Sequence, residues 1–231
     1  MPQTSPLLVF DLDGTLAETA GDLVATLNVI LAREGLAPVA LADARKMVGA
    51  GARALIQRGF EAGGRSIEGA ALENLFKDFL TYYEAHIADE STLFDGVVAA
   101  LDRFEAAGWD FAVCTNKVEH PSVRLLEALG IRNRFRAICG QDTFTVDGVA
   151  ISKPDPRALL MTIEKARGVP NCAIMVGDSR TDIDTAKAAG IPVVAVDFGY
   201  TDMPVAHFGP DSVIGHFDEL WDAVAQLKAF N

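Results

Sequence analysis

The sequence predicts an α/β fold: a doubly wound, mainly parallel sheet with an inserted all-helical domain. Two observations support this. Short apolar runs alternate with helical patterns along most of the chain, and these runs are apolar at consecutive positions rather than at every second one. Continuous apolar runs are typical of strands covered on both faces, as in parallel sheets. In addition, the interval from about residue 18 to residue 91 has helical patterns but no convincing strand.

The strands are predicted from their apolar, β-branched composition. The strongest runs cover residues 7–10, 111–114 and 173–176. Shorter candidates of the same type cover residues 137–139, 193–196 and 212–214. Because none of these runs alternates with polar residues, we expect the sheet to be buried between two layers of helices.

Glycine marks the ends of the helices between these strands. A glycine followed by an apolar residue ends a helical pattern at Gly35, Gly108, Gly130, Gly168 and Gly190. Glycine adopts the left-handed conformation at the C′ position without steric cost, and the next apolar residue packs back on the helix. We therefore expect all five glycines to end a helix in this way. The resulting alternation of helix and strand builds a doubly wound sheet.

The helical interval separates the first predicted strand from the second. Residues 23–32 and 71–87 have amphipathic helical patterns, and their apolar residues are expected to form a core rather than a binding stripe. We expect residues 1–17 and 92–231 to form the α/β core. Residues 18–91 are expected to form a helical domain that sits above the sheet.

Composition and charge limit the classes of partner. The 231 residues include 20 Lys and Arg against 32 Asp and Glu, for a formal net charge of −12. Nucleic acid is not an expected partner, because affinity for its backbone requires Lys and Arg. With no signal-type start and no run of about 18 apolar residues, we expect no membrane association and a cytoplasmic location. The sequence leaves the choice between monomer and homodimer open.

The cysteines are not expected to form a disulfide framework. Their number is odd, and each lies in or beside an apolar run: Cys114, Cys139 and Cys172. We expect buried free thiols at all three positions.

Polar and charged residues cluster in four segments that follow predicted strands or precede predicted helices. These segments cover residues 11–16, 115–117, 152–156 and 177–182. In open α/β sheets, ligands bind beyond the carboxyl ends of the strands. We therefore expect the four segments to meet at one edge of the sheet and to form the functional site.

The residue types in these segments suit phosphoryl chemistry with a divalent cation. Asp11 and Asp178 offer hard oxygen ligands, and Mg²⁺ prefers a small number of carboxylates. Without a cation, clustered carboxylates would repel one another and raise their own pKa values. A phosphoryl group would be matched by the hydroxyl of Thr115, the amide of Asn116 and the positive charge of Lys153. An aspartate can also attack phosphorus directly.

Single residues of this set have simpler structural explanations. Asp155 before Pro156 is most simply a helix N-cap followed by proline at the first helical position. Asp182 is explained equally well by helix capping and by support of a metal site. Thr115 and Asn116 are explained by helix capping too. Only the combination, in this order and at these strand ends, favours a functional site.

These segments resemble the four motifs of the haloacid dehalogenase superfamily of phosphatases. The stretch DLDGTL (residues 11–16) is similar to the first motif, Thr115 to the second, Lys153 to the third and GDSRTD (residues 177–182) to the fourth. The resemblance runs from residue 7 to about residue 196. It implies that residues 18–91 are a cap domain and that the chain hydrolyses a phosphomonoester with Mg²⁺.

The resemblance also implies roles for individual residues. Asp11 would attack phosphorus and hold Mg²⁺. Asp13 would act as general acid and base, and its backbone carbonyl would contact the metal. Asp178 would complete the metal site, with Asp182 as its support. The groups implied to bind the phosphoryl oxygens are the backbone amide of Gly14, Thr115, Asn116 and Lys153.

Within the superfamily, the chain is most similar to the phosphoglycolate phosphatases. The similar stretches are VGAGA (residues 48–52), CTNK (residues 114–117) and VGDS (residues 176–179). The first resembles a substrate-specificity loop, in which Gly49, Gly51 and Arg53 would approach the substrate, although a simple loop between helices explains it equally well. The implied partner is a small phosphorylated metabolite, and the implied reaction is hydrolysis of 2-phosphoglycolate.

Other functions fit the same residues. A phosphatase for another small ester, a pyrophosphatase and a phosphosugar mutase on the same core all remain alternatives. A phospho-accepting receiver module uses similar side chains, but it would be about half this length and would have no cap. A dehalogenase needs neither Asp13 nor Mg²⁺, so it is disfavoured.

Overall fold

A computed structural model describes residues 5–44, 47–48, 51–201 and 203–228. Its main sheet has six strands in the order β10-β9-β8-β1-β4-β5, and every neighbouring pair is parallel. The doubly wound α/β prediction is therefore confirmed, and all the predicted strands belong to this sheet. The strands are β1 (Leu7–Phe10), β4 (Asp110–Cys114), β5 (Phe135–Cys139), β8 (Ala173–Gly177), β9 (Val193–Val196) and β10 (Ser212–Ile214).

Helices cover both faces of this sheet, which explains its continuous apolar runs. In β1, Leu8 and Phe10 pack in one apolar cluster, while Leu7 and Val9 pack in another. The first cluster includes residues of α5 (Val97–Ala106), α6 (Glu119–Ala128) and α9 (Leu220–Lys228), and the second includes residues of α7 (Pro156–Lys165) and α8 (Arg180–Ala189). None of the helices in the described ranges is both long enough and apolar enough for a membrane span.

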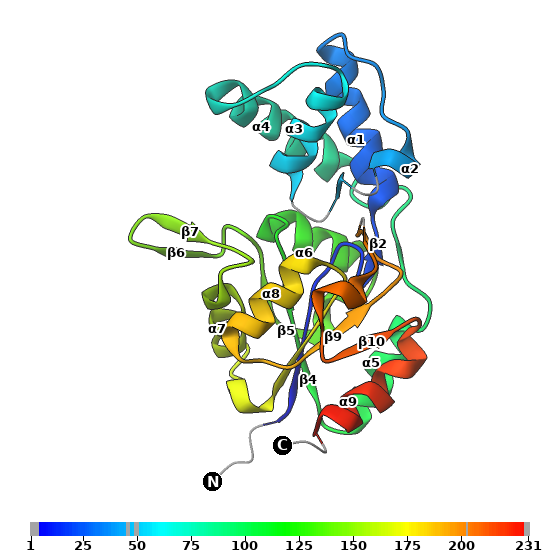
Figure 1. Ribbon diagram of the computed structural model, residues 1–231, viewed down its shortest axis with the longest axis vertical. Coiled ribbons are helices and arrows are strands. Elements are labelled where there is room, and N and C mark those ends of the chain that lie inside the picture. Colours follow the sequence, from blue (N-terminus) through cyan, green and yellow to red (C-terminus); the bar gives the residue numbers. More distant parts are fainter. Residues whose placement is uncertain (1–4, 45–46, 49–50, 202, 229–231) are drawn as a thin grey trace.

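The other α-helices of the described residues lie together at one end of the molecule, above the sheet in Figure 1. They are α1 (Ala20–Arg33), α2 (Leu41–Ala44), α3 (Ala52–Ala62) and α4 (Gly69–Ala85), and we refer to residues 18–91 as the helical unit. Residues of α1, α3 and α4 form most of a third apolar cluster, which also includes Tyr200 from the loop after β9. The helical interval predicted from the sequence is thus helical in the structure.

Two connections join the helical unit to the sheet, and they run side by side. The strand β2 (Ala17–Glu18) pairs antiparallel with β3 (Thr92–Leu93). Next to this pair, the buried carboxylate of Asp22 in α1 accepts hydrogen bonds from the backbone N–H groups of Glu90 and Ser91 and from the Ser91 hydroxyl, at 2.6–3.2 Å. The start of α1 is therefore tied to the second connection.

A β-hairpin that the apolar pattern does not indicate projects from the body of the molecule (Figure 1). Its strands are β6 (Phe144–Val146) and β7 (Val149–Ile151), which pair antiparallel. Each strand is short and partly exposed, so neither forms a long apolar run. The turn residues Asp147 and Gly148 have φ values of 52° and 78°. Asp-Gly is a preferred pair for tight hairpin turns, so the sequence did contain a signal for this element.

The glycine rule for helix ends holds at four of the five predicted positions. Gly35, Gly108, Gly130 and Gly190 have φ values of 71°, 80°, 76° and 68°. At the fifth position the prediction is wrong, because α7 ends at Lys165 and Arg167 takes the left-handed conformation with a φ of 60°. Gly168 instead provides space, since a Cβ atom there would lie 2.8 Å from Cδ2 of Leu7 in β1.

The cysteines are free thiols, as predicted, but they are not all buried. Cys114 in β4 and Cys139 in β5 are buried, whereas Cys172 is partly exposed. Cys172 lies in the short 3₁₀ turn of Pro170–Cys172 that precedes β8, and not in the strand itself. Burial raises the pKa of the Cys114 thiol to about 12, so this group stays protonated at neutral pH.

Candidate active site

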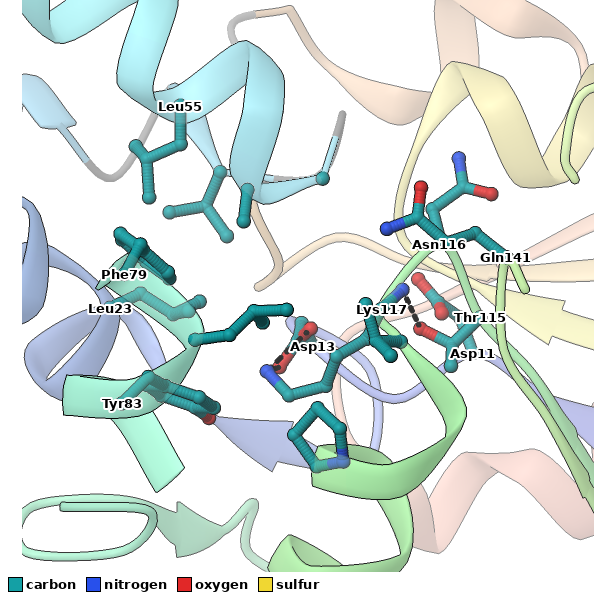
Figure 2. Close-up of a pocket in the computed structure, with 16 residues that line it drawn as sticks. Asp11, Asp13, Leu23, Leu55, Phe79, Tyr83, Thr115, Asn116, Lys117 and Gln141 are labelled. Atoms are coloured by element: carbon teal, nitrogen blue, oxygen red, sulfur yellow. Dashed lines mark hydrogen bonds and ion pairs between the residues drawn. The ribbon is translucent and has the colours of Figure 1, made fainter. Parts of the chain in front are cut away.

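The candidate site lies beyond the carboxyl end of β1, where the strand order reverses. From β1 the chain adds β4 and β5 on one side, and it then returns to add β8, β9 and β10 on the other. Asp11 directly follows β1, Thr115 follows β4 and Asp178 follows β8. Such switch points are where doubly wound sheets bind ligands. Figure 2 shows the pocket above this edge, with Asp11, Asp13, Thr115 and Asn116 in its wall.

Three carboxylates meet beneath this pocket. Asp11, Asp178 and Asp182 are all buried, and each offers a ligand atom within 4.8 Å of those of the other two. The ammonium of Lys153, also buried, lies 2.9 Å from Oδ1 of Asp11 and 2.5 Å from Oδ1 of Asp182. One cation thus faces three acidic groups. The structure brings together the residues that the sequence placed in three separate motifs.

This arrangement shifts the protonation of the buried groups. Burial raises the pKa of Asp11 to about 6, with the repulsion from Asp182 adding to the effect and the attraction of Lys153 opposing it. Burial and the charges of Asp182 and Asp11 raise the pKa of Asp178 well above its usual value. Burial alone would lower the pKa of Lys153, but Asp11 and Asp182 outweigh it and raise that pKa. The site therefore has more acidic charge than its lysine can balance.

Local structure holds Lys153 and Asp182 in place. Asp182 forms a capping box with Ser179 at the start of α8, so it caps the helix and contacts Lys153 at the same time. The backbone carbonyl of Lys153 accepts a hydrogen bond of 3.0 Å from the side-chain amide of Asn116. As predicted, Asp155 is the N-cap of α7 and accepts from the N–H of Arg157. Asp182 therefore serves both as part of the helix cap and as a partner of Lys153.

The carboxylate of Asp178 accepts hydrogen bonds from the protein and packs closely against Gly14. It accepts hydrogen bonds from the Thr15 hydroxyl at 3.3 Å and from the backbone N–H of Tyr200 at 2.6 Å. A Cβ atom on Gly14 would lie 2.5 Å from Oδ2 of Asp178, so only glycine fits here. The N–H of Gly14 donates to the carbonyl of Ala17 at 2.9 Å, which corrects the expectation that this amide is available to a phosphoryl oxygen.

Asp13 has a different environment from Asp11. Its carboxylate lines the pocket and is only slightly exposed. It accepts hydrogen bonds from Lys117 Nζ at 3.1 and 3.2 Å and from the Thr19 hydroxyl at 2.8 Å. The Lys117 ammonium also lies 4.3 Å from the centre of the Tyr83 ring in α4. Burial would lower the pKa of Lys117, but Asp13 and Tyr83 raise it overall. Sequence reasoning gave Lys117 no role, although it belongs to the CTNK stretch.

Three backbone amides at the site have no acceptor in the part of the chain that the structure describes. Among the described residues, none accepts a hydrogen bond from the N–H of Leu12, Asp13 or Asn116. These residues sit in the turns that follow β1 and β4, and such amides suit the binding of anions. The motifs pointed to these turns, but a sequence does not reveal which of their amides remain unpaired.

The helical unit forms the opposite wall of the pocket, and this wall is apolar. It consists of Leu23, Val48, Leu55, Phe79, Leu80 and Tyr83, together with Gly51 and Ala52 at the start of α3. Gly51 has a φ of 86°, and a Cβ atom there would lie 3.3 Å from the backbone carbonyl of Asn116. The start of α3 therefore lies against the turn after β4. In Figure 2 the labelled apolar side chains face Asp13 and Lys117 across the pocket.

The other two residues of the expected specificity loop give a different result. Gly49 lies outside the described residues. The guanidinium of Arg53 donates to Glu73, with an N–O distance of 2.7 Å, and lies 3.6 Å from the centre of the Phe76 ring. Arg53 is not among the described residues that line the pocket, so the structure does not bring it to the site. Its side chain instead contacts the Glu73 carboxylate and the Phe76 ring, both on α4.

Comparison with known proteins identifies the family. The family model for haloacid dehalogenase-like hydrolases matches residues 8–196. The chain is a haloacid dehalogenase-like hydrolase. It is 52% identical over 221 residues to a phosphoglycolate phosphatase of Mesorhizobium japonicum, covering 96% of this chain and 95% of that protein. It is 46% identical to a phosphoglycolate phosphatase of Agrobacterium fabrum, covering 95% of this chain and 92% of that protein.

A solved structure agrees with this assignment. The crystal structure of a predicted phosphoglycolate phosphatase from Haemophilus somnus has a TM-score of 0.85 to this chain at 27% sequence identity. It covers 97% of this chain and 100% of that chain. The resemblance inferred from the motifs is therefore confirmed, and the chain is a phosphatase of the haloacid dehalogenase-like family.

The residues of this haloacid dehalogenase-like site fit a hard divalent cation. Oδ1 of Asp11 is buried and has no hydrogen bond of good geometry to any described residue, although Lys153 is near. The backbone carbonyl of Asp13 also accepts no hydrogen bond within the described part of the chain. The oxygens of Asp182 are engaged by Lys153 and Ser179. Asp11, Asp178 and the Asp13 carbonyl are therefore the groups that fit such a cation.

The raised pKa of Asp11 predicts a pH-dependent cost to stability in the metal-free protein. Its pKa is about 6 in the folded protein, against an ordinary value of 3.8. Between these values the folded state binds more protons than the unfolded chain, so this group destabilises the fold as pH rises. The melting temperature of Asp11→Asn should equal that of the wild type near pH 4 and exceed it above pH 6.

Thermal melts of both proteins in buffer without divalent cations, from pH 4 to pH 8, measure this difference. If the wild type melts at a higher temperature than Asp11→Asn at pH 7.5, the negative charge of Asp11 is balanced in the folded protein and this prediction is wrong.

Proposed function

We propose that this phosphatase is a Mg²⁺-dependent phosphomonoester hydrolase that acts through an aspartyl-phosphate on Asp11, and that it hydrolyses 2-phosphoglycolate to glycolate and phosphate. The observation that carries the proposal is the pairing of two different carboxylates in one pocket. Asp11 is buried beside Lys153 and Asp178, while Asp13 is partly exposed and held by Lys117 and Thr19. Two carboxylates in different environments suit two different roles.

In the first step, the Asp11 carboxylate attacks phosphorus. An acyl phosphate bond forms, and the bond between phosphorus and the ester oxygen breaks. Asp13, in its protonated form, donates a proton to the departing oxygen, so that glycolate leaves as an alcohol. Asp13 lies two residues beyond Asp11 on the same turn, which is why one pocket can hold both carboxylates.

In the second step, a water molecule attacks the phosphorus of the aspartyl-phosphate. Asp13, now a carboxylate, takes a proton from this water. The bond between phosphorus and the Asp11 oxygen breaks, which releases phosphate and restores the Asp11 carboxylate. Splitting hydrolysis in this way replaces one difficult displacement by two easier ones.

Fixed charges and dipoles stabilise the transferring phosphoryl group. Lys153 supplies the positive charge nearest to Asp11, and the side chains of Thr115 and Asn116 lie at the next strand end. The unpaired amides of Leu12 and Asp13 replace the Gly14 amide in this role. When bound at Asp11, Asp178 and the Asp13 carbonyl, Mg²⁺ would supply positive charge to a phosphoryl oxygen and balance the carboxylates. Such preorganised electrostatics is usually the largest single contribution to catalysis.

We also propose that residues 18–91 form a cap domain over the site. Its apolar wall would exclude bulk water from the phosphoenzyme. Among the described residues that line the pocket, Lys117 is the sole cation, which suits a small ester with one further acidic group better than a bisphosphate. The two relatives at 52% and 46% identity support 2-phosphoglycolate as that ester.

A panel of small esters tests the proposal. Phosphate release should be strongest from 2-phosphoglycolate, weaker from hexose phosphates, nucleoside monophosphates and pyrophosphate, and absent when EDTA replaces Mg²⁺. If phosphate is released only from another ester, the proposed reaction type stands, but 2-phosphoglycolate is not the substrate. If well-folded protein releases phosphate from none of them, the hydrolase proposal fails and a mutase becomes the better explanation.

A further inference from the structure

A residue of the loop after β9 holds the start of the first helix of the helical unit. Thr19 is the N-cap residue of α1, yet its side chain makes no capping hydrogen bond. A threonine at this position normally caps the helix with its own hydroxyl. Here the hydroxyl of Tyr200 accepts hydrogen bonds from the backbone N–H groups of Thr19, at 2.6 Å, and Ala20, at 2.9 Å. Its own proton is donated to Oε1 of Glu18 at 2.6 Å.

These hydrogen bonds fix the backbone that carries the Thr19 hydroxyl, and this hydroxyl itself makes no capping bond. That hydroxyl donates to Oδ1 of Asp13 at 2.8 Å. We propose that Tyr200 is a positioning residue for the phosphatase reaction: by holding the backbone at the start of α1, it fixes the Thr19 hydroxyl where it orients the carboxylate of Asp13. This inference rests on the proposed role of Asp13 as general acid and base.

Tyr200 is well placed to link the two parts of the molecule. It follows β9, it is 3% exposed, and its ring belongs to the apolar cluster of the helical unit. Its backbone N–H donates to Oδ2 of Asp178 at 2.6 Å. One residue therefore contacts a candidate metal ligand through its backbone and the first turn of α1 through its side chain.

The consequence of removing the Tyr200 hydroxyl follows from these contacts. The buried N–H of Thr19 would lose its acceptor, whereas that of Ala20 would keep Oε1 of Glu18 at 3.2 Å. An unpaired buried donor is costly. The Thr19 hydroxyl lies 3.5 Å from that of Tyr200 but cannot replace it, because an N-cap hydroxyl reaches the N–H groups two or three residues further along the helix and not its own. The backbone at the start of α1 would therefore shift, and the Thr19 hydroxyl that it carries would no longer be held 2.8 Å from Oδ1 of Asp13. The ring of phenylalanine would still fill the apolar cluster.

The first test is the kinetics of Tyr200→Phe with 2-phosphoglycolate and with 4-nitrophenyl phosphate. We expect kcat to fall about tenfold while KM changes less than about twofold, because the affected group acts in the reaction and not in substrate binding. Tyr82→Phe, at a partly exposed tyrosine of α4 that stacks on His86, is the matched control and should behave as wild type. A wild-type kcat for Tyr200→Phe overturns the proposal.

A double-mutant cycle tests the route through Thr19. Thr19→Val should lower kcat on its own, and Thr19→Ser should restore it relative to Thr19→Val, because serine retains the hydroxyl. If Tyr200 acts through this hydroxyl, Tyr200→Phe should reduce kcat less than about twofold in the Thr19→Val background. Equal effects of Tyr200→Phe in both backgrounds would show that it acts by another route. The Thr19 pair also gives an answer if Tyr200→Phe does not fold.

Hydrogen exchange provides a readout that does not depend on activity. Peptides that cover the start of α1 should exchange faster in Tyr200→Phe than in Tyr82→Phe, while peptides from β1 and β8 should not change. Unaltered exchange at α1 would reject the role of Tyr200 in holding this helix. If the wild type releases phosphate from neither ester, the proposed function fails, and the exchange experiment still decides whether Tyr200 holds the start of α1.

Discussion

Asp11→Asn is expected to abolish phosphate release, with a loss of at least about 10³-fold in kcat. The asparagine amide is a poor nucleophile toward phosphorus, so the aspartyl-phosphate cannot form. The change also removes one of the negative charges that face the buried ammonium of Lys153. Release of phosphate from 2-phosphoglycolate with saturating Mg²⁺ measures the loss.

The control for this variant is Asp184→Asn. Asp184 lies on the exposed side of α8, where it pairs with Arg180 at 3.2 Å, and its substitution should leave activity unchanged. Because Asp11→Asn is also expected to melt at a higher temperature than the wild type above pH 6, loss of activity cannot then be attributed to unfolding. Residual activity within tenfold of the wild type would reject Asp11 as the nucleophile.

The sheet could be predicted from sequence because its strands are buried on both faces. Four consecutive apolar residues in β1 pack alternately in two clusters, and this gives a signal that requires no knowledge of the partner strands. The pairs β2–β3 and β6–β7 give no such signal. They have two or three residues per strand and pair locally, so their formation depends on the connections around them and not on a buried apolar face.

The sequence could predict only those residues of the candidate site that directly follow a strand. Asp11, Thr115 and Asp178 each follow a strand of one parallel sheet, so their proximity follows from the topology. The partners of these residues depend on contacts between distant parts of the chain. Lys117 meets Asp13 across 104 positions, and Tyr200 meets Thr19 across 181 positions. No local pattern records such contacts.

The sequence also could not predict which backbone N–H groups of the site are already hydrogen-bonded. The DLDGTL stretch identifies the turn after β1, but the turn itself determines which N–H groups are paired. In the structure the Gly14 amide is used within the turn, whereas those of Leu12 and Asp13 are not. Glycine is required at position 14 for a different reason, because a side chain there would meet the carboxylate of Asp178.

The second large effect is expected for Lys153→Met, which should lower the free energy of unfolding by about 3–5 kcal/mol in the metal-free protein. The ammonium of Lys153 is buried and contacts both Asp11 and Asp182, and Asp178 lies within the same cluster. Methionine matches the length of the lysine chain but leaves the three carboxylates without a cation. Urea unfolding at pH 7.5 measures the loss, and Lys77→Met on the exposed side of α4 is the control.

The pH dependence and a second substitution identify the cause of this loss. As pH falls below the Asp11 pKa of about 6, protonation removes one of the uncompensated charges, so Lys153→Met should cost less at pH 5 than at pH 7.5. For the same reason, adding Asp11→Asn to Lys153→Met should recover part of the stability at pH 7.5. A loss that is equal at both pH values and unaffected by Asp11→Asn would mean that packing of the lysine chain, and not its charge, stabilises this site.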